Sequence, residues 1–401
     1  MKKTASLDGI FLGFYSLFVL MPYFFTNGLT AAMNNIIAIF GALYLLSKKY
    51  KPKSFEVILL IYYFFLTAIS VFNHTEASGM HQITSYGKIL IFLGVIDTML
   101  EKRGEMVLVI ISRVLGIYVL LDFLALLFFP NGLIQEARVF DMWSTAYDPI
   151  WVFGRKNNRI FYYMIEILLN GWRYTVRRNL HNKILSYVTV FVSLTAIVLE
   201  KSSTSLIVIV FVSVSMLIFL SKKERNLHIN IKSFLFAYLL VAVAIVEGQT
   251  GLFQNIVVGI FKKTMTFSGR TIIWQQVLLL ISQKPLFGWG DMGADAMSKL
   301  LGNVFFTSAH NQWLNLLLQG GIVLFSTCSI LYISVFKKIE QQKDLRIQLL
   351  LTIIMFGMFV DMLFEAQFNS LPSNLLLMMI YLFAYKGNDI RVKNRLSYRS
   401  Y

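Results

Sequence analysis

Hydrophobic residues gather in long runs along this chain, and short polar or basic segments separate the runs. Because the bilayer core offers no water to the backbone, an apolar run that crosses it forms a helix of roughly 20 residues. The pattern predicts twelve membrane-spanning helices, some of them short, at residues 8–25, 29–46, 55–72, 85–99, 106–129, 160–171, 184–199, 205–220, 234–246, 310–336, 347–365 and 374–385.

Composition agrees with this reading of the pattern. Hydrophobic residues make up 57% of the chain and charged residues only 14%, with a mean hydropathy of +0.64. A soluble domain of this length is far less apolar. We therefore predict an all-α polytopic membrane protein whose residues 1–401 form a single integral membrane domain.

The basic balance of the chain does not indicate nucleic-acid binding. The net charge is +16, but lysines and arginines punctuate the predicted spans and do not gather on one solvated surface. Only Lys2 and Lys3 precede the first apolar run, and no small-residue cleavage site follows it, so we expect a retained first helix. The single cysteine, Cys328, lies within a predicted span and excludes a disulfide within the chain.

The distribution of lysine and arginine predicts the orientation. Basic residues are concentrated in the short connections that lie inside if both termini are cytoplasmic, such as 48–53 and 173–183. Two segments on the other side, residues 130–159 and 247–309, are much longer than a turn requires. Long loops on a rigid frame commonly carry function, so the site is expected in these two outer loops.

The second long loop contains a short apolar helix at residues 271–281, which ends before Pro285. Ser268 is a candidate N-cap, which places Arg270 in the first turn, where a cation meets the positive end of the helix dipole. A bound phosphate would relieve this conflict. Trp274 lies one turn further on the same face, and Gly269 adjoins Arg270. The alternative is an Arg270 that faces water or a lipid phosphate.

His310 and Asn311 stand at the start of the predicted span 310–336. With Ser308 as the cap, His310 falls in the first turn, where the helix dipole favours a neutral imidazole that can accept a proton from a sugar hydroxyl. An interfacial histidine that contacts water or lipid is the alternative. Further along, Gly320 and Gly321 permit close approach of another helix, which indicates packing.

Residues 285–290 are predicted to form a turn that reverses the chain. No strand precedes them and no P-loop lysine-serine pair follows them, which excludes a nucleotide-binding loop. Asp291 and Asp295 come next, but two isolated carboxylates make a poor metal site. We predict no metal and no cofactor.

The first long loop ends in three cations within five residues, Arg155, Lys156 and Arg159. Lysine and arginine are usually concentrated in cytoplasmic connections, so a cluster of basic residues in an outer loop needs an explanation. Binding of a diphosphate is one reason and contact with lipid head groups is the other. Asp141 and Asp148 in the same loop are alternative bases.

Charged residues within spans are costly, and we expect them to face the bundle interior or to pair with one another. They are Lys88, Asp97, Arg113, Asp122, Glu166 and Asp361. Lys88 and Arg113 could line a path for an anionic head group or hold helices together.

The motifs of the second loop, taken together, resemble the O-antigen ligase/polymerase superfamily. The resemblance rests on their order, their spacing and their place in a large outer loop: Ser268-Gly269-Arg270 with Trp274, then Lys284-Pro285-Leu286-Phe287-Gly288-Trp289-Gly290, then His310-Asn311 and Gly321. It implies a GT-C-like membrane glycosyltransferase that uses sugar chains on undecaprenyl diphosphate. By the same resemblance, Arg270 engages the diphosphate and His310 is essential. By a looser similarity, Arg155 and Arg159 are partner cations beside Lys156.

The chain departs from the pattern of this superfamily at two positions. Some ligases show Arg-x-x-x-Leu where Trp274 stands here, and Leu324 occupies a position where a small or β-branched residue is frequent. These departures concern the acceptor more than the donor.

From the resemblance we predict a repeat-unit polymerase of O-antigen, capsule or exopolysaccharide in a bacterial inner membrane, with its site facing outward. Arg270 and His310 act in catalysis, and Gly269, Trp274 and Asn311 support them. Expected partners are undecaprenyl-diphosphate-linked oligosaccharides, membrane lipids, a chain-length regulator and a flippase. The alternatives are an O-antigen ligase with a lipid A-core acceptor, a lipid-linked oligosaccharide flippase or other transporter, and a structural membrane subunit.

Overall fold

The computed structural model describes residues 7–73, 75, 79–139, 145–221, 235–236, 238–239, 270–301 and 308–399. Within these ranges the chain is helical apart from one hairpin. The elements are α1 (Leu7–Val19), the 3₁₀ helix η1 (Tyr23–Phe25), α2 (Gly28–Ser47), α3 (Ser54–Phe72), α4 (Gly79–Phe128), β1 (Ile134–Val139), β2 (Thr145–Ile150), α5 (Ile160–Val176), α6 (Leu180–Glu200), α7 (Ser203–Leu220), α10 (Arg270–Gln283), α11 (Gly293–Leu300), α12 (Gln312–Glu340), α13 (Leu345–Met362) and α14 (Leu371–Arg399).

The described helices confirm the polytopic membrane class. Eight of the predicted spans are helices long and apolar enough to cross a bilayer: α2, α3, α6, α7, α12, α13 and the two halves of α4, Gly79–Glu101 and Met106–Phe128. The first and last predicted spans are the shorter apolar helices Asp8–Val19 and Leu371–Tyr385. The span predicted at 160–171 is α5, which is buried along nearly all of its length. Most of the span predicted at 234–246 lies outside the described residues.

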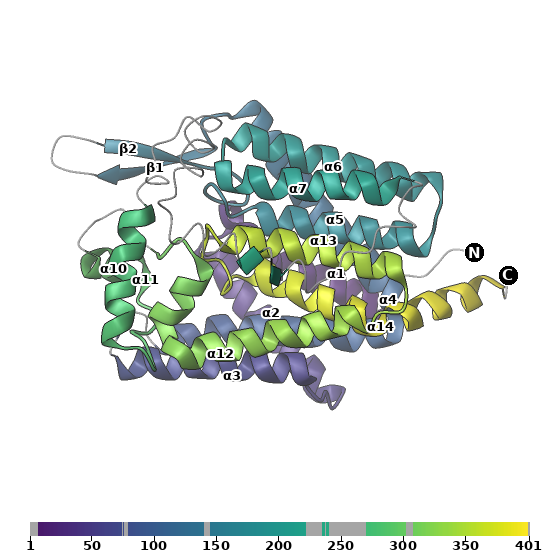
Figure 1. Ribbon diagram of the computed structural model, residues 1–401. Helices are drawn as coiled ribbons and strands as arrows, with labels where there is room; N and C mark the ends of the chain where they lie inside the picture. The colour runs from purple at the N-terminus through teal and green to yellow at the C-terminus, as the bar shows by residue number, and fades with distance from the viewer. Residues whose placement is uncertain are drawn as a thin grey trace.

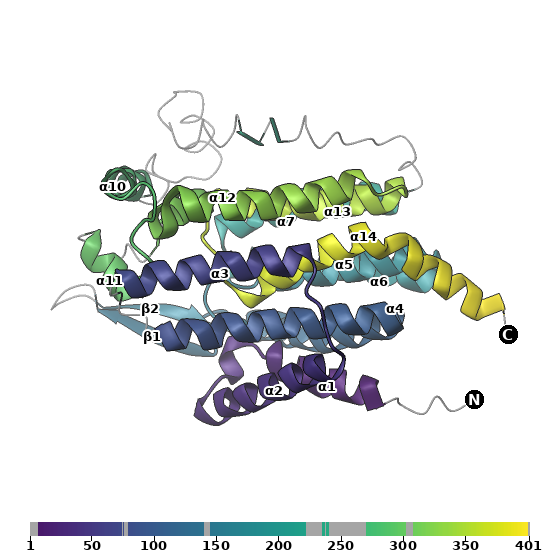
Figure 2. The same cartoon turned by 90° about the horizontal axis from the view of Figure 1, so that it is seen from below.

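The helices run lengthwise in one bundle whose two ends differ (Figures 1 and 2). The hairpin, α10 and α11 lie together at one end, where α10 runs across the bundle. The described chain begins, in α1, and ends, in α14, at the opposite end. The two predicted long loops therefore meet at the same end.

The first of these loops contains an element that the all-α prediction did not include. Strands β1 and β2 pair antiparallel, with Ile134 opposite Ile150 and Val139 opposite Thr145. Asp141 lies outside the described residues. The hairpin places Glu136 and Asp148 opposite each other beside the cation cluster.

Helix α12 is broken one third of the way along, at Gly321, where φ is +57°. The turn of residues 285–290 packs against the break: Trp289 N donates to Leu318 O at 2.8 Å, Gly290 N donates to Gln319 O at 2.8 Å, and Ile322 N donates to the Pro285 carbonyl at 2.9 Å. Backbone groups released by the break thus find partners within the protein, as a membrane requires. The predicted close approach at Gly320 and Gly321 is confirmed, but the partner is this turn and not another helix.

The charged residues within the spans behave in different ways. Asp97 is fully buried and pairs with Lys53 at 2.5 Å, and buried Glu166 accepts a hydrogen bond from the Ser112 hydroxyl at 2.9 Å. Arg113 is exposed on the bundle surface, so the expectation that it faces the interior is wrong. A long arginine side chain can reach the interface from a lipid-facing position, which explains why the bundle tolerates it there.

Candidate functional site

Arg270 is the first residue of α10, so it lies in the first turn as predicted. Its Nη2 lies 2.7 Å from Oε1 of Glu365, and its guanidinium group lies 5.9 Å from the centre of the Phe364 ring. The side chain is 17% exposed, so the pair is shielded but accessible from one side. Ser268 and Gly269 lie outside the described residues.

Trp274 connects α10 to the segment that carries His310. The indole is buried, and its Nε1 donates a hydrogen bond to the Ala309 carbonyl at 2.9 Å. The predicted supporting residue therefore has a specific structural task. It holds the first turn of α10 beside the residue that precedes His310.

His310 precedes α12 and does not lie in its first turn. The helix begins at Gln312, and the Asn311 side chain caps it by accepting hydrogen bonds from Trp313 N at 3.0 Å and Leu314 N at 3.1 Å. The prediction that Ser308 caps the helix is wrong, because Asn311, three residues further on, is an equally suitable cap residue and fills that role. His310 has φ +45°, and its N–H donates to the Ser308 hydroxyl at 3.2 Å.

Glu365 joins the two residues that the sequence singled out. One carboxylate oxygen, Oε1, lies 2.7 Å from Arg270 Nη2, and the other, Oε2, lies 3.5 Å from His310 Nδ1. Oε1 also accepts a hydrogen bond from Asn157 Nδ2 at 2.7 Å. The carboxylate is 9% exposed. Sequence reasoning placed Glu365 at the outer end of a span and gave it no role.

Asn157 links the first long loop to this carboxylate. Its backbone N–H donates to Glu200 Oε1 at 2.6 Å, and its carbonyl accepts from Gln367 Nε2 at 3.0 Å. Its φ of +70° falls in the left-handed region that asparagine tolerates better than most residues. Asn157 of the first loop and Arg270 of the second loop therefore contact the same carboxylate.

Arg159 and Arg155 have partners other than Arg270. Arg159 is fully buried, with Nε 2.9 Å from Asp122 Oδ2 and Nη1 2.8 Å from Glu200 Oε1. Burial, the largest single effect, lowers the Arg159 pKa, but the charges of these two carboxylates outweigh it and raise the pKa above its usual value. Because the charge of Arg159 balances these two carboxylates in the bundle core, Arg159 is not among the residues that we propose to bind a diphosphate.

Arg155 and Lys156 are both exposed at the same end of the bundle. Arg155 pairs with Glu136 on β1, and the hydrogen bond between them raises the Arg155 pKa. These two residues can meet a solvent-borne or head-group phosphate at the rim of the site. They are not part of its shielded centre.

A neutral cavity of about 440 Å³ is lined by Asn158 and Ala366, the residues that directly follow Asn157 and Glu365 in the chain. Aromatic rings and side-chain amides line it, and Phe153 stacks on Tyr162 with ring centres 4.1 Å apart. Such a lining suits a polyhydroxylated ligand better than an ion. The lining residues are Tyr23, Phe153, Asn158, Tyr162, Ala366, Gln367, Asn369, Ser370 and Pro372.

Acidic residues near the site form no metal centre in the described part of the chain, where no group of three or more His, Cys, Asp or Glu side chains could hold an ion. Asp291 accepts hydrogen bonds from the Tyr86 hydroxyl at 2.9 Å and from Gln319 Nε2 at 3.2 Å. It therefore fastens the turn that follows Gly290 to neighbouring helices.

Part of the chain matches a known protein family. Residues 188–328 match the profile of the family described as O-antigen ligase, a range that contains Arg270, Trp274, His310 and Asn311. Comparison with curated proteins gave no significant match. The family suggests a glycosyltransferase-like ligase or polymerase. The predicted resemblance is thus confirmed over residues 188–328, whose match is consistent with the O-antigen ligase/polymerase superfamily.

Proposed function

We propose that this chain is a polysaccharide repeat-unit polymerase of the GT-C type. It transfers the growing glycan of O-antigen, capsule or exopolysaccharide from undecaprenyl diphosphate to a sugar hydroxyl of another lipid-linked repeat unit. The observation that supports it most is that Arg270 and His310, both within the family region, meet at one shielded carboxylate, Glu365.

The donor side of the reaction needs positive charge. The acceptor oxygen attacks C1 of the donor sugar, the C1–O bond to the diphosphate breaks, and undecaprenyl diphosphate leaves as an anion. Arg270 offers this anion a planar fork of N–H donors, a preorganised arrangement for charge that develops in the transition state. A diphosphate that binds there competes with Glu365 for the guanidinium group.

The acceptor side needs a group that takes a proton. His310 Nδ1 faces Glu365 Oε2, which leaves Nε2 as the nitrogen that can accept the hydroxyl proton. A carboxylate behind the imidazole fixes its orientation and stabilises the imidazolium that forms. At 3.5 Å the contact is longer than a good hydrogen bond, and we expect it to shorten when substrate is bound.

The neutral cavity near Glu365 is a candidate binding site for the acceptor sugar. Rings such as Tyr23 and Phe153 suit the apolar faces of a pyranose, and amides such as Asn158 and Gln367 suit its hydroxyls. We propose that the acceptor repeat unit lies in this cavity while its lipid tail remains in the membrane.

The proposed setting is a bacterial inner membrane, with both termini cytoplasmic and the site facing outward. Undecaprenyl-diphosphate-linked oligosaccharides and membrane lipids are the direct partners. A chain-length regulator and a flippase act with the chain in the same process. No cofactor takes part.

An O-antigen ligase is the second candidate, and the description of the matched family favours it. It shares the donor chemistry and transfers the glycan to lipid A-core. Trp274 at the fourth position after Arg270, where some ligases carry leucine, supports the polymerase.

The test uses purified full-length protein and a defined undecaprenyl-diphosphate-linked repeat unit, without metal or nucleotide. A ladder of longer products supports polymerisation. Transfer only when lipid A-core is added supports ligation instead. Movement of the lipid-linked sugar across a vesicle membrane without a new glycosidic bond contradicts both proposals.

A further inference from the structure

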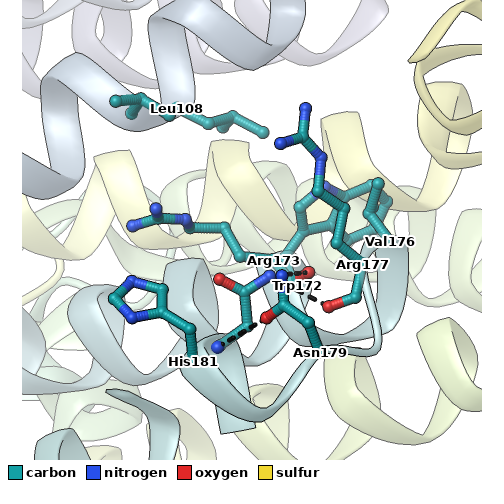
Figure 3. A pocket seen from close by; sticks show the side chains of 9 residues that line it. Leu108, Trp172, Arg173, Val176, Arg177, Asn179 and His181 are labelled. Atoms are coloured by element: carbon teal, nitrogen blue, oxygen red, sulfur yellow. Dashed lines mark hydrogen bonds between the residues drawn. The ribbon is translucent and has the colours of Figure 1, made fainter. Parts of the chain in front are cut away.

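A second cavity, of about 170 Å³, lies between α4, α5 and α6 at the end of the bundle opposite to the candidate site (Figures 1 and 3). Figure 3 shows the guanidinium groups of Arg173 and Arg177 reaching from α5 and its end toward Leu108 of α4, with the His181 ring below Arg173. Trp172, Val176, Asn179 and Asn182 contribute to its wall, as does Val109.

The backbone that carries these cations is fixed. Asn182 Nδ2 donates to the Arg177 carbonyl at 2.9 Å and lies 3.3 Å from the Arg173 carbonyl, which it also contacts as a donor. Asn179 caps α6 by accepting a hydrogen bond from Asn182 N at 2.8 Å. The turn between α5 and α6 therefore fixes the backbone from which both arginine side chains extend.

The charge of the cavity is of one sign. Its lining contains two arginines and a histidine and no acidic side chain. The nearby carboxylate, Glu166, is buried, accepts hydrogen bonds from Ser112 and Asn170, and interacts electrostatically with Arg173 from outside the cavity lining. Two guanidinium groups in the wall of one small hollow supply the positive charge and the N–H donors that a phosphate needs.

The apolar part of the lining indicates where the phosphate comes from. Leu108 and Val109 lie at the start of the span Met106–Phe128, and His181 lies at the start of the span Leu180–Glu200. Span ends are the depth at which lipid head groups lie, and basic pockets between helices bind anionic head groups there. Leu108, Val109 and Val176 provide the surface that a glycerol backbone and the first acyl carbons need.

We propose that this cavity binds the phosphate of an anionic phospholipid head group, with Arg173 and Arg177 as its ligands. The site is separate from the proposed glycosyl transfer, since it lies at the other end of the bundle and shares no residue with the candidate site. Its ligand is phosphatidylglycerol or a lipid of similar charge.

Native mass spectrometry of the full chain in detergent tests the proposal. Phosphatidylglycerol, phosphatidylcholine and inorganic phosphate are titrated separately against the native chain and against the variants Arg173→Gln and Arg173→Lys. We expect phosphatidylglycerol to bind the native chain and to bind Arg173→Gln roughly tenfold more weakly, as the loss of one charge-assisted hydrogen bond implies. Arg173→Lys should restore part of the binding, because it restores the charge without the fork.

Lys183→Gln is the matched control, since Lys183 lies on α6 outside the cavity and contacts the Tyr187 ring. It removes the same charge and should leave binding unchanged. Equal weakening by Lys183→Gln, or equal binding of phosphatidylcholine, overturns the proposal. Binding of inorganic phosphate that excludes phosphatidylglycerol keeps the phosphate site but overturns its assignment to lipid.

A measurement on the native chain covers the case in which a variant fails to fold. A photoactivatable phosphatidylglycerol is crosslinked to the protein in vesicles, and the modified peptides are identified. Crosslinks to Leu108, Val109 or residues 172–182 support the proposal. Crosslinks spread evenly over the bundle surface contradict it.

Discussion

Glu365 is the residue on which the candidate site depends most, because it meets Arg270, His310 and Asn157 at once. Its two oxygens have different partners: Oε1 contacts the Arg270 guanidinium group and the Asn157 amide, and Oε2 faces the His310 imidazole. In the proposed reaction, a diphosphate that draws Arg270 away from Oε1 would leave the carboxylate more strongly directed at His310. This proposal connects donor binding and acceptor activation through one side chain.

Replacing Arg270 with lysine tests the demand for bidentate geometry. Lysine keeps the charge and the pair with Glu365, but it presents a point charge to the diphosphate. We expect activity to fall at least tenfold, roughly the contribution of one charge-assisted hydrogen bond. The measurement is product chain length from purified protein. Arg103→Lys makes the same change in the exposed pair with Asp8 and should not alter it. Native-length polymer from Arg270→Lys would refute this role.

Glu365→Gln tests the carboxylate behind His310. The amide keeps the shape of the side chain and removes the charge that stabilises an imidazolium. We expect kcat to fall by about 100-fold, within the range typical of general acid–base catalysis, with little change in KM for the acceptor. Glu101→Gln is the control, because Glu101 also pairs with a cation, Lys53, outside the site. An unchanged kcat would mean that Glu365 has only a structural role.

Some of the site residues could be predicted from the sequence and others could not, for a physical reason. Arg270 and His310 stand in recognisable motifs, whereas Glu365 is 95 residues from Arg270 and contacts it only in the fold. Arg159 looked like a free surface cation because its counter-charges, Asp122 and Glu200, are 37 and 41 residues distant. Local patterns report charge, and only the fold reports which charges are already paired.

At the scale of elements, the break in α12 positions the site. Residues 285–290 form hydrogen bonds with the broken turn, and α10 directly precedes this segment. Trp274 of α10 also donates a hydrogen bond to the carbonyl of Ala309, the residue before His310. Helix α10 is therefore connected to α12 both through this bond and through the turn that follows it. The position of Arg270 therefore depends on packing about as much as on its own contacts.

Gly321→Ala tests this coupling. A Cβ at Gly321 would lie 2.3 Å from the Leu286 carbonyl carbon, and φ there is +57°. We expect a cost of about 1–3 kcal/mol in stability, with reduced activity, since the turn must move. Thermal unfolding and chain-length assays measure both effects. Gly87→Ala, a helical position where a Cβ meets nothing within 4 Å, should change neither. A fully active and stable Gly321→Ala variant would contradict the argument.

Hydrophobic runs predicted the spans well because bilayer burial imposes length and composition on each helix separately. The hairpin of the first loop and the exact start of α12 were not predicted, because they depend on local competition between neighbouring residues. Asn311 and Ser308 both suit an N-cap, and the fold uses Asn311. Such choices are decided by contacts like that of Asn311 Nδ2 with the Leu363 carbonyl, at 3.1 Å.

At the scale of the whole molecule, the two cavities stand at opposite ends of the bundle and differ in character. The cavity near Glu365 is neutral, whereas the cavity near Arg173 is cationic. This division fits a chain that handles sugars on one side of the membrane and contacts anionic head groups on the other. The family region, 188–328, includes neither Glu365 nor Asn157, so the complete candidate site extends beyond it.

The orientation in the membrane is tested with single cysteines in intact cells. Cys328 is fully buried, so it should not react with a membrane-impermeant maleimide in the folded protein. Lys156→Cys introduces an exposed thiol at the end that carries the candidate site, and Lys51→Cys introduces one in the connection between α2 and α3. Because the positive-inside rule assigns 48–53 to the cytoplasm, we expect Lys156→Cys to be labelled in intact cells and Lys51→Cys only after lysis. The reverse pattern would place the glycosyl-transfer site in the cytoplasm and exclude the proposed polymerisation on the outer face.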